Sequence, residues 1–301
     1  MSLSMTLTRT LIGVVVHAAG GADHAPDQLA AVLDPNRREA IPHRGLRSRT
    51  ATSRWEVAGR PVLWMAPVSG ATRTVLVYWH GGGFIDPLNP AHWLMLDRLQ
   101  RRSGATLVVP SYALAPDYRF DDTLPLIDAL NERLAAPVGD LRARLVVGGD
   151  SAGGALAMAQ AIRARDLGGP TIDAVALVAP WVDLSMANPD AWELDPVDVM
   201  LQCNRLVAAG RAWAGDRATT DPLVSPLYDR LSGLPPITVY QGGADILAPD
   251  ARLFAEKARE AGTPTRLFDV PGAPHVYPMA VWTPEARAAL NDMAQVILGR
   301  A

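Results

Sequence analysis

Ser151 stands in the pattern Gly149-Asp-Ser-Ala-Gly153, which can supply a nucleophile. An apolar run over 144–147 precedes the pattern, and a helical pattern over 152–166 follows it. A sharp turn from strand to helix would strain the serine backbone and expose its hydroxyl, and the flanking glycines would avoid clashes across that turn. The helix start would favour negative charge beside the serine. The alternative is a glycine-rich turn in which Ser151 caps the helix or binds phosphate.

A second glycine-rich stretch, His80-Gly-Gly-Gly-Phe84, follows the apolar run 74–79. Acyl transfer to serine needs at least two hydrogen-bond donors where the oxyanion develops. We expect one donor from Gly81 or Gly82 and another from the amide of Ala152. Because both glycine-rich stretches occur together, each at the end of its own strand, they favour an acyl-transfer site over two unrelated loops.

The nucleophile needs a base and an acid. Of six histidines only His275 follows Ser151, and on a sheet of this kind the triad runs in the order serine, acid, histidine. Asp245 follows the apolar run 237–240 and fits the acidic position, whereas Asp250 follows a proline and fits a helix start better. We therefore expect Ser151 to attack the acyl carbon, His275 to transfer its proton, and Asp245 to orient the imidazole.

Short apolar runs alternate with helical patterns along most of the chain. The runs lie at 74–79, 105–110, 144–147, 172–179, 237–240 and 265–270, and they are typical of strands buried on both faces of a parallel sheet. Helical patterns follow at 92–102, 123–135, 152–166, 250–261 and 284–298. This order predicts an α/β fold with a mostly parallel, doubly wound sheet. The runs 54–57 and 62–65 predict an antiparallel hairpin at one edge.

Two segments interrupt this alternation. Residues 22–50 are polar. The residues from about 184 to 220 contain several prolines and carry a helical pattern near 197–213. Long additions to a compact sheet are usually functional. We expect residues 1–50 and the insertion at about 184–220 to form a helical cap over the carboxyl edge of the sheet, where ligands bind. Residues 51–301 would form the catalytic domain that carries the insertion.

Composition excludes several classes of protein. With 301 residues, of which 49% are hydrophobic and 20% charged, the chain is too apolar to be disordered. The net charge of −3, without a concentrated basic face, argues against a nucleic-acid partner. No apolar run approaches the ~18 residues of a membrane span, and the single cysteine, Cys203, fits the cytoplasm, with export left open. Scattered histidines and the lack of metal or dinucleotide motifs predict no metal and no cofactor.

The two glycine-rich stretches, His80–Phe84 and Gly149–Gly154, resemble the bacterial hormone-sensitive-lipase-like family of carboxylesterases. Four further stretches support the resemblance: Tyr112–Asp117, Ala179–Leu184, Asp221–Pro226 and Pro274–Tyr277. Ala113 and Asp117 depart from the arginine and glutamate that are usual in the family. The resemblance implies an α/β-hydrolase fold with a cap and the hydrolysis of small carboxylic esters.

Phe84 and Trp181 are the residues that we expect to contact the substrate. Trp181 follows the run 172–179 and should therefore lie near Ser151, where a rigid aromatic ring can close the acyl pocket and favour short acyl chains. The alternative is that Trp181 packs in the core of the lid. The expected partner is a small-molecule ester, and a homodimer is left open.

The same triad could hydrolyse amides or formamides, or transfer an acyl group to an alcohol. A third interpretation is a non-catalytic receptor, since the plant gibberellin receptors resemble this family. We disfavour it because those receptors lack the catalytic histidine, which is present here as His275.

Overall fold

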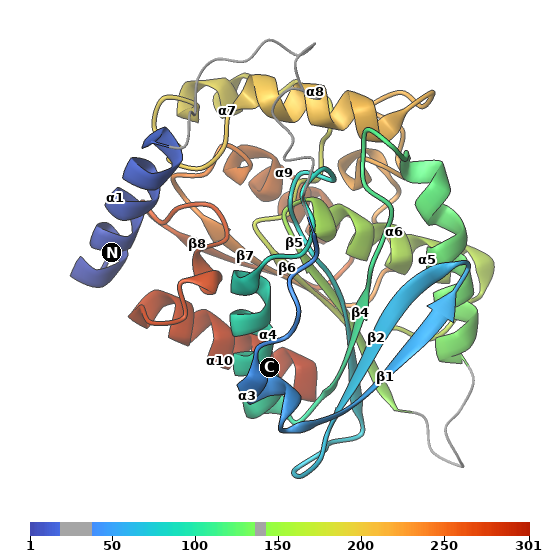
Figure 1. Cartoon of the computed structure of the whole chain (residues 1–301). Coiled ribbons are helices and arrows are strands. Elements are labelled where there is room, and N and C mark those ends of the chain that lie inside the picture. The colour runs from blue at the N-terminus through green and yellow to red at the C-terminus, as the bar shows by residue number, and fades with distance from the viewer. Residues whose placement is uncertain (19–37, 136–142) are drawn as a thin grey trace.

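The computed structural model describes residues 1–18, 38–135 and 143–301. In the described residues a central sheet of eight strands has the order β1-β2-β4-β3-β5-β6-β7-β8 (Figure 1). Neighbours from β4 to β8 in this order pair in parallel, whereas β1 and β2 pair antiparallel and β2 also pairs antiparallel with β4. The strands are β1 (Thr50–Val57), β2 (Arg60–Pro67), β3 (Thr74–Trp79), β4 (Thr106–Pro110), β5 (Arg144–Asp150), β6 (Ala174–Val178), β7 (Ile237–Gly242) and β8 (Thr265–Val270).

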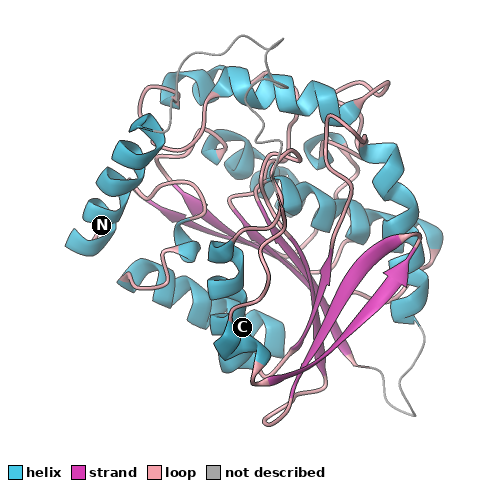
Figure 2. Cartoon of the chain, viewed as in Figure 1, coloured by secondary structure: helices cyan, strands magenta, loops and turns pink. Residues whose placement is uncertain are grey.

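Helices cover both faces of the sheet (Figure 2). In β3, Val75, Val77 and Trp79 belong to the core that also holds residues of α5, α6 and α9. Leu76 and Tyr78 belong to a second core that holds residues of α4 and α10. Successive side chains of a strand point to opposite faces, so the strands are buried on both sides as the sequence predicts. These helices are α4 (Pro90–Ser103), α5 (Phe120–Ala135), α6 (Ala152–Leu167), α9 (Ala248–Glu260) and α10 (Pro284–Leu298).

The remaining helices lie outside this regular alternation. Helices α7 and α8 lie above the sheet in Figure 1, with α1 to one side. They are α1 (Leu3–Ala18), the short α3 (Arg44–Arg47), α7 (Pro189–Leu194) and α8 (Cys203–Ala214), with 3-10 turns at Pro226–Tyr228 and Tyr277–Met279. We call residues 184–220 the cap segment. Residues 19–37, which include much of the expected N-terminal part of the cap, lie outside the described residues.

The cap segment differs from its sequence-based expectation. The helical pattern near 197–213 gives a helix only from Cys203, as α8. The carboxylate of Asp198 accepts hydrogen bonds from the amides of Met200 and Leu201, at 2.8 and 3.0 Å. An aspartate that binds the amides two and three residues ahead stabilises a turn in place of a continuous helix. Helix α1 lies within the N-terminal residues 1–50 that we expect to contribute to the cap, although no helical pattern identifies it there.

No helix in the described part of the chain is both long and apolar enough to cross a membrane.

Candidate active site

Ser151 lies on a strained turn between β5 and α6. Its backbone has φ 51° and ψ −123°, in the positive-φ region that residues other than glycine rarely adopt. A Cβ on Gly149 would overlap the carbonyl oxygen of Gly153, and a Cβ on Gly153 would overlap that of Trp79. Close backbone approach thus explains why glycine stands on both sides of the serine. The turn is held by the amide of Ser151, which donates to the carbonyl of Val178 at 2.9 Å.

His275 and Asp245 come together from the loops after β8 and β7. Nδ1 of His275 lies 2.7 Å from Oδ2 of Asp245, and both side chains are buried. The same carboxylate accepts from Nε2 of Gln241 and from the amide of Leu247, each at 2.8 Å. Asp250, the alternative acid, lies in the first turn of α9 and accepts from Nδ2 of Asn188. The structure therefore pairs His275 with Asp245, and this bond leaves Nε2 of His275 for another partner.

Charge surrounds His275 on several sides. Burial by itself lowers the pKa of the imidazole, but the charge and hydrogen bond of Asp245 and the charges of Asp198 and Asp150 together raise it above its ordinary value. A raised pKa means that this site stabilises the imidazolium, which is the form that a general base takes when it accepts a proton.

Ser151 and His275 line one cavity of about 510 Å³. This volume is typical of small-molecule sites. Most of the remaining wall is apolar and comes from three places. Helix α1 contributes Thr8, Leu11 and Ile12; the cap segment contributes Met200, Leu201, Gln202, Arg205, Leu206 and Ala209; and the region after His275 contributes Val276, Tyr277, Met279, Ala280 and Trp282. An ion pair of 3.7 Å between Arg205 and Asp86 connects the cap segment to the loop after β3.

The glycines after β3 divide into two roles. The amide of Gly81 donates to Oδ1 of Asp150 at 3.0 Å, so this donor is already used within the protein. Gly82 and Gly83 line the cavity beside Ser151. The amide of Ala152 is the first of α6, and the first amides of a helix have no acceptor within the helix. Gly82 and Gly83 therefore lie beside Ser151, whereas the Gly81 amide is occupied by Asp150; the role of the Ala152 amide as an oxyanion donor stays a prediction.

Asp150 holds this loop in place. Its buried carboxylate accepts from the hydroxyl of Tyr78 at 2.7 Å as well as from Gly81, and Nε2 of His92 lies 3.3 Å from Oδ2. Nδ1 of His92 accepts from the amide of Asn89, which leaves Nε2 as the protonated nitrogen facing Asp150. Asp150 stands inside the nucleophile pattern, and sequence reasoning assigned it no role.

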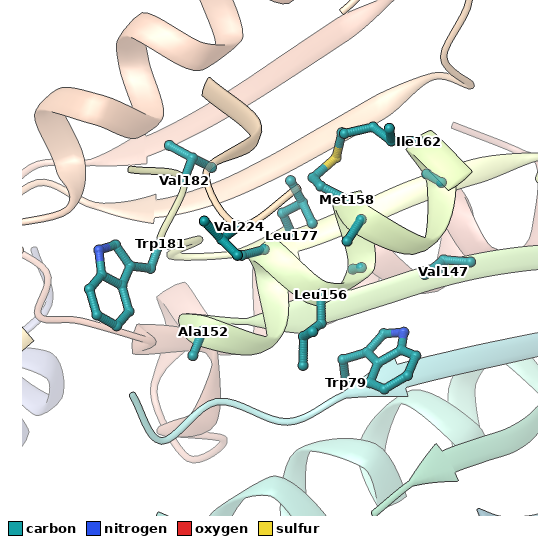
Figure 3. Close-up of a cluster of buried hydrophobic side chains, with 14 of the residues drawn as sticks. Trp79, Val147, Ala152, Leu156, Met158, Ile162, Leu177, Trp181, Val182 and Val224 are labelled. Atoms are coloured by element: carbon teal, nitrogen blue, oxygen red, sulfur yellow. The ribbon is translucent and has the colours of Figure 1, made fainter. Parts of the chain in front are cut away.

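Phe84 and Trp181, the two aromatic residues expected to contact substrate, lie in the hydrophobic core and are not among the residues that line the cavity. Trp181 is fully buried, and its indole nitrogen donates to the carbonyl of Asp183 at 2.8 Å. Its ring packs against that of Phe84 with 5.5 Å between centroids. Figure 3 shows Trp181 at the same end of the buried cluster as Ala152. For Trp181 these contacts favour the alternative, packing in the core, over contact with the substrate; contact of Phe84 with the substrate stays a prediction.

Sequence reasoning also missed the residues that the cap segment and α1 bring to the site. Leu11, Arg205 and Leu206 line the cavity, and Asp198 lies close enough to affect His275. None of them belongs to a motif. Only the folded chain brings them within reach of Ser151.

The chain matches the model of a family described as having the alpha/beta hydrolase fold over residues 76–279. An esterase from the bacterial hormone-sensitive lipase family superposes with a TM-score of 0.80 at 26% identity, covering 100% of this chain and 99% of that one. The chain therefore belongs to the α/β-hydrolase family, among the hormone-sensitive-lipase-like esterases.

Curated relatives have related names. An esterase of Acinetobacter venetianus is 31% identical over 229 residues, which are 75% of each protein. A triacylglycerol lipase of Mycobacterium tuberculosis is 36% identical over 194 residues, which are 64% of this chain but only 39% of that lipase. These names, together with the fold, confirm the sequence-based prediction of a carboxylic ester hydrolase.

Proposed function

We propose that this protein is a serine carboxylesterase that cleaves small, short-chain carboxylic esters through an acyl-enzyme. One observation carries the proposal: Ser151, on its strained turn, shares a cavity with a histidine whose other ring nitrogen is bound to a buried carboxylate. Nucleophile, base and orienting acid are the three parts of a hydrolytic triad.

The chemistry follows from this arrangement. Ser151 Oγ attacks the acyl carbon while Nε2 of His275 takes the hydroxyl proton. His275 then returns the proton to the departing alcohol oxygen, which leaves Ser151 acylated. Water then attacks the acyl carbon while its proton passes to Nε2 of His275, and His275 gives that proton to Ser151 Oγ as the carboxylic acid is released. Asp245 keeps the proton on Nδ1 and stabilises the imidazolium that forms twice in each turnover.

The oxyanion of each tetrahedral intermediate would be bound by the amides of Gly82, Gly83 and Ala152. Gly81 would act through the loop, because its amide anchors this loop to Asp150. Donors fixed before the reaction need no reorganisation when charge develops, which is the main source of their effect on rate.

The substrate preference rests on the cavity. Its wall is mainly apolar around the polar centre, which suits an ester with a small acyl and alcohol part better than a charged or extended molecule. In place of the aromatic residues first expected, Leu206 of α8 and Leu11 of α1 would limit the length of the acyl chain.

Hydrolysis of p-nitrophenyl esters by wild type and Ser151→Ala tests the proposal. Loss of a triad nucleophile costs about 10⁴–10⁶ in kcat. Ser111→Ala is a matched control, because this serine follows β4, donates to Glu39, and is not among the residues that line the cavity. A fluorophosphonate probe should label wild type and the control but not Ser151→Ala.

Two results would count against the proposal. Folded wild type without activity on any ester of the series would remove the assignment as an esterase. Faster cleavage of the matching p-nitroanilide would instead favour amide hydrolysis by the same triad.

A further inference from the structure

Asp198 of the cap segment reaches across to the loop that carries Asp245. Its Oδ2 accepts a hydrogen bond of 2.9 Å from the amide of Ile246, the residue directly after Asp245. Its Oδ1 accepts from Met200 and Leu201 within the cap segment. One carboxylate therefore connects the turn before α8 to the loop that carries Asp245, which we call the acid loop.

The cap segment is tied down beside this bridge. The guanidinium of Arg9, on α1, donates to the carbonyl of Val197 at 2.9 Å and to that of Gly272 at 3.4 Å. Met200 and Leu201, whose amides Asp198 binds, line the cavity. The position of the cavity wall relative to the acid loop thus depends on the contacts of two adjacent residues, Val197 and Asp198.

The charge of Asp198 also acts on the site. Burial raises the pKa of Asp198 to about 6, with the charge of Asp245 adding to the rise, while His275 and the amides of Met200 and Ile246 oppose it. In turn the charge of Asp198 contributes to the raised pKa of His275.

The charged and titratable groups around the bridge come from several elements. Asp245 and His275 approach from the loops after β7 and β8, the thiol of Cys203 from α8, and Arg9 from α1 through its bond to the neighbouring Val197. Asp150 is a further carboxylate whose charge acts on His275. Of these groups Asp198 is the one that joins the cap segment to the acid loop.

We propose that Asp198 is a positioning residue of this active site: it holds the acid loop against the cap segment and places a second negative charge beside His275. The inference rests on the proposed function. A turn by itself needs only a neutral acceptor such as asparagine or serine. A carboxylate so close to Asp245 is repelled by it, and it offers the site a charge that favours the imidazolium formed in each acyl-transfer step.

The test compares Asp198→Asn and Asp198→Ser with wild type. An asparagine must turn its NH₂ toward Ile246 or toward the turn amides, so it loses one side of the bridge as well as the charge. Serine keeps an acceptor for the turn and loses the charge, which provides a second variant if the first folds poorly. Asp198→Glu restores the charge.

Asp195→Asn is the matched control. Asp195 lies in the same segment, and its carboxylate also accepts a backbone amide, that of Cys203 at 2.6 Å. Its charge is not among those that raise the pKa of His275. The control therefore reports what the loss of a structural contact in this segment does by itself.

Two readouts are needed. In both neutral variants kcat should fall more than KM rises, and the acidic limb of the kcat/KM profile should move to lower pH. Asp198→Glu should bring the limb back toward wild type, and Asp195→Asn should leave it in place. Titration of the His275 ring by NMR, assigned with His275→Gln, should show the same acid shift without any substrate.

The outcomes separate the two proposals. If folded Asp198→Asn and Asp198→Ser show the wild-type titration of His275, or if Asp195→Asn shifts it equally, the positioning role is overturned. If wild type cleaves no ester while the NMR shift appears, the proposed function fails and the electrostatic coupling stands.

Discussion

Replacing Asp245 by asparagine is the sharpest test of which acid serves His275. The carboxylate of Asp245 accepts three hydrogen bonds, from His275, Gln241 and Leu247. All three partners are donors, so an asparagine side chain must turn its NH₂ toward at least one of them. If the NH₂ group faces Leu247, two buried N–H donors point at each other and neither has an acceptor. If it faces His275, the imidazole must move its proton to Nε2, where a base for Ser151 needs a lone pair.

Either orientation removes the negative charge that stabilises the imidazolium. The corresponding change in a serine protease triad costs about 10⁴ in kcat, which corresponds to about 5.4 kcal/mol in the activation free energy. We expect a loss of this order for Asp245→Asn in steady-state hydrolysis of p-nitrophenyl acetate. A thermal melt should show that the variant is folded.

Asp250→Asn is the control for this prediction. Asp250 accepts from Asn188, and burial raises its pKa to about 6, so a neutral amide that keeps an acceptor is tolerated there. Its kcat should stay close to wild type, with a stability change of about 1 kcal/mol at most. A larger kcat loss in Asp250→Asn than in Asp245→Asn would refute the assignment of the acid.

Hydrolysis should rise with pH through an apparent pKa above 6.5, because the net effect of the charges around His275 is to raise its pKa from that value; a limb below 6.5 would contradict this electrostatic reading. Because its pKa is higher in the folded state, protonated His275 adds to the free energy of unfolding. In urea unfolding at a series of pH values, this contribution should be complete below about pH 6.5 and should be lost as the pH rises through the folded-state pKa. EDTA should leave activity unchanged, and a loss that a divalent metal reverses would disprove a metal-free mechanism. Leu206→Ala should raise the octanoate-to-acetate ratio of kcat/KM, since Leu206 lines the cavity and each accommodated methylene contributes about 0.8 kcal/mol. Trp181→Ala should leave that ratio unchanged when it is measured on folded protein. In a separate urea titration this variant should show a free energy of unfolding that is lower by about 3–5 kcal/mol, because the buried ring of Trp181 fills core volume.

Local patterns were sufficient for the regular part of the fold. The predicted runs 74–79 and 265–270 coincide with β3 and β8, and the helical pattern 284–298 coincides with α10. These elements follow from apolar periodicity and from residues near their ends, such as Thr283, whose side chain accepts from the amide of Ala286. Helix α1 is also capped, since the hydroxyl of Ser2 accepts from the amide of Met5 at 3.2 Å, but its apolar residues do not follow a single-face pattern clearly enough to predict a helix.

The glycine-rich stretches and the order of Ser151, Asp245 and His275 were visible in the sequence because strain and close backbone approach restrict residue type at those positions. Gly149 and Gly153 are glycine since a Cβ would overlap neighbouring carbonyl oxygens. A requirement of this kind acts within a few residues of the chain, so it leaves a motif.

Only the tertiary structure decided which groups surround that motif. It gives the Gly81 amide to Asp150, keeps Trp181 in the core, and brings Asp198 to the loop of Asp245 from 47 positions away along the chain. These contacts depend on how the cap segment packs over the sheet, and packing between distant segments leaves no periodic pattern in either of them. The sequence by itself determined the fold class, the candidate nucleophile and the candidate base, whereas the shape of the cavity and the charges acting on His275 arise from contacts that exist only in the folded chain.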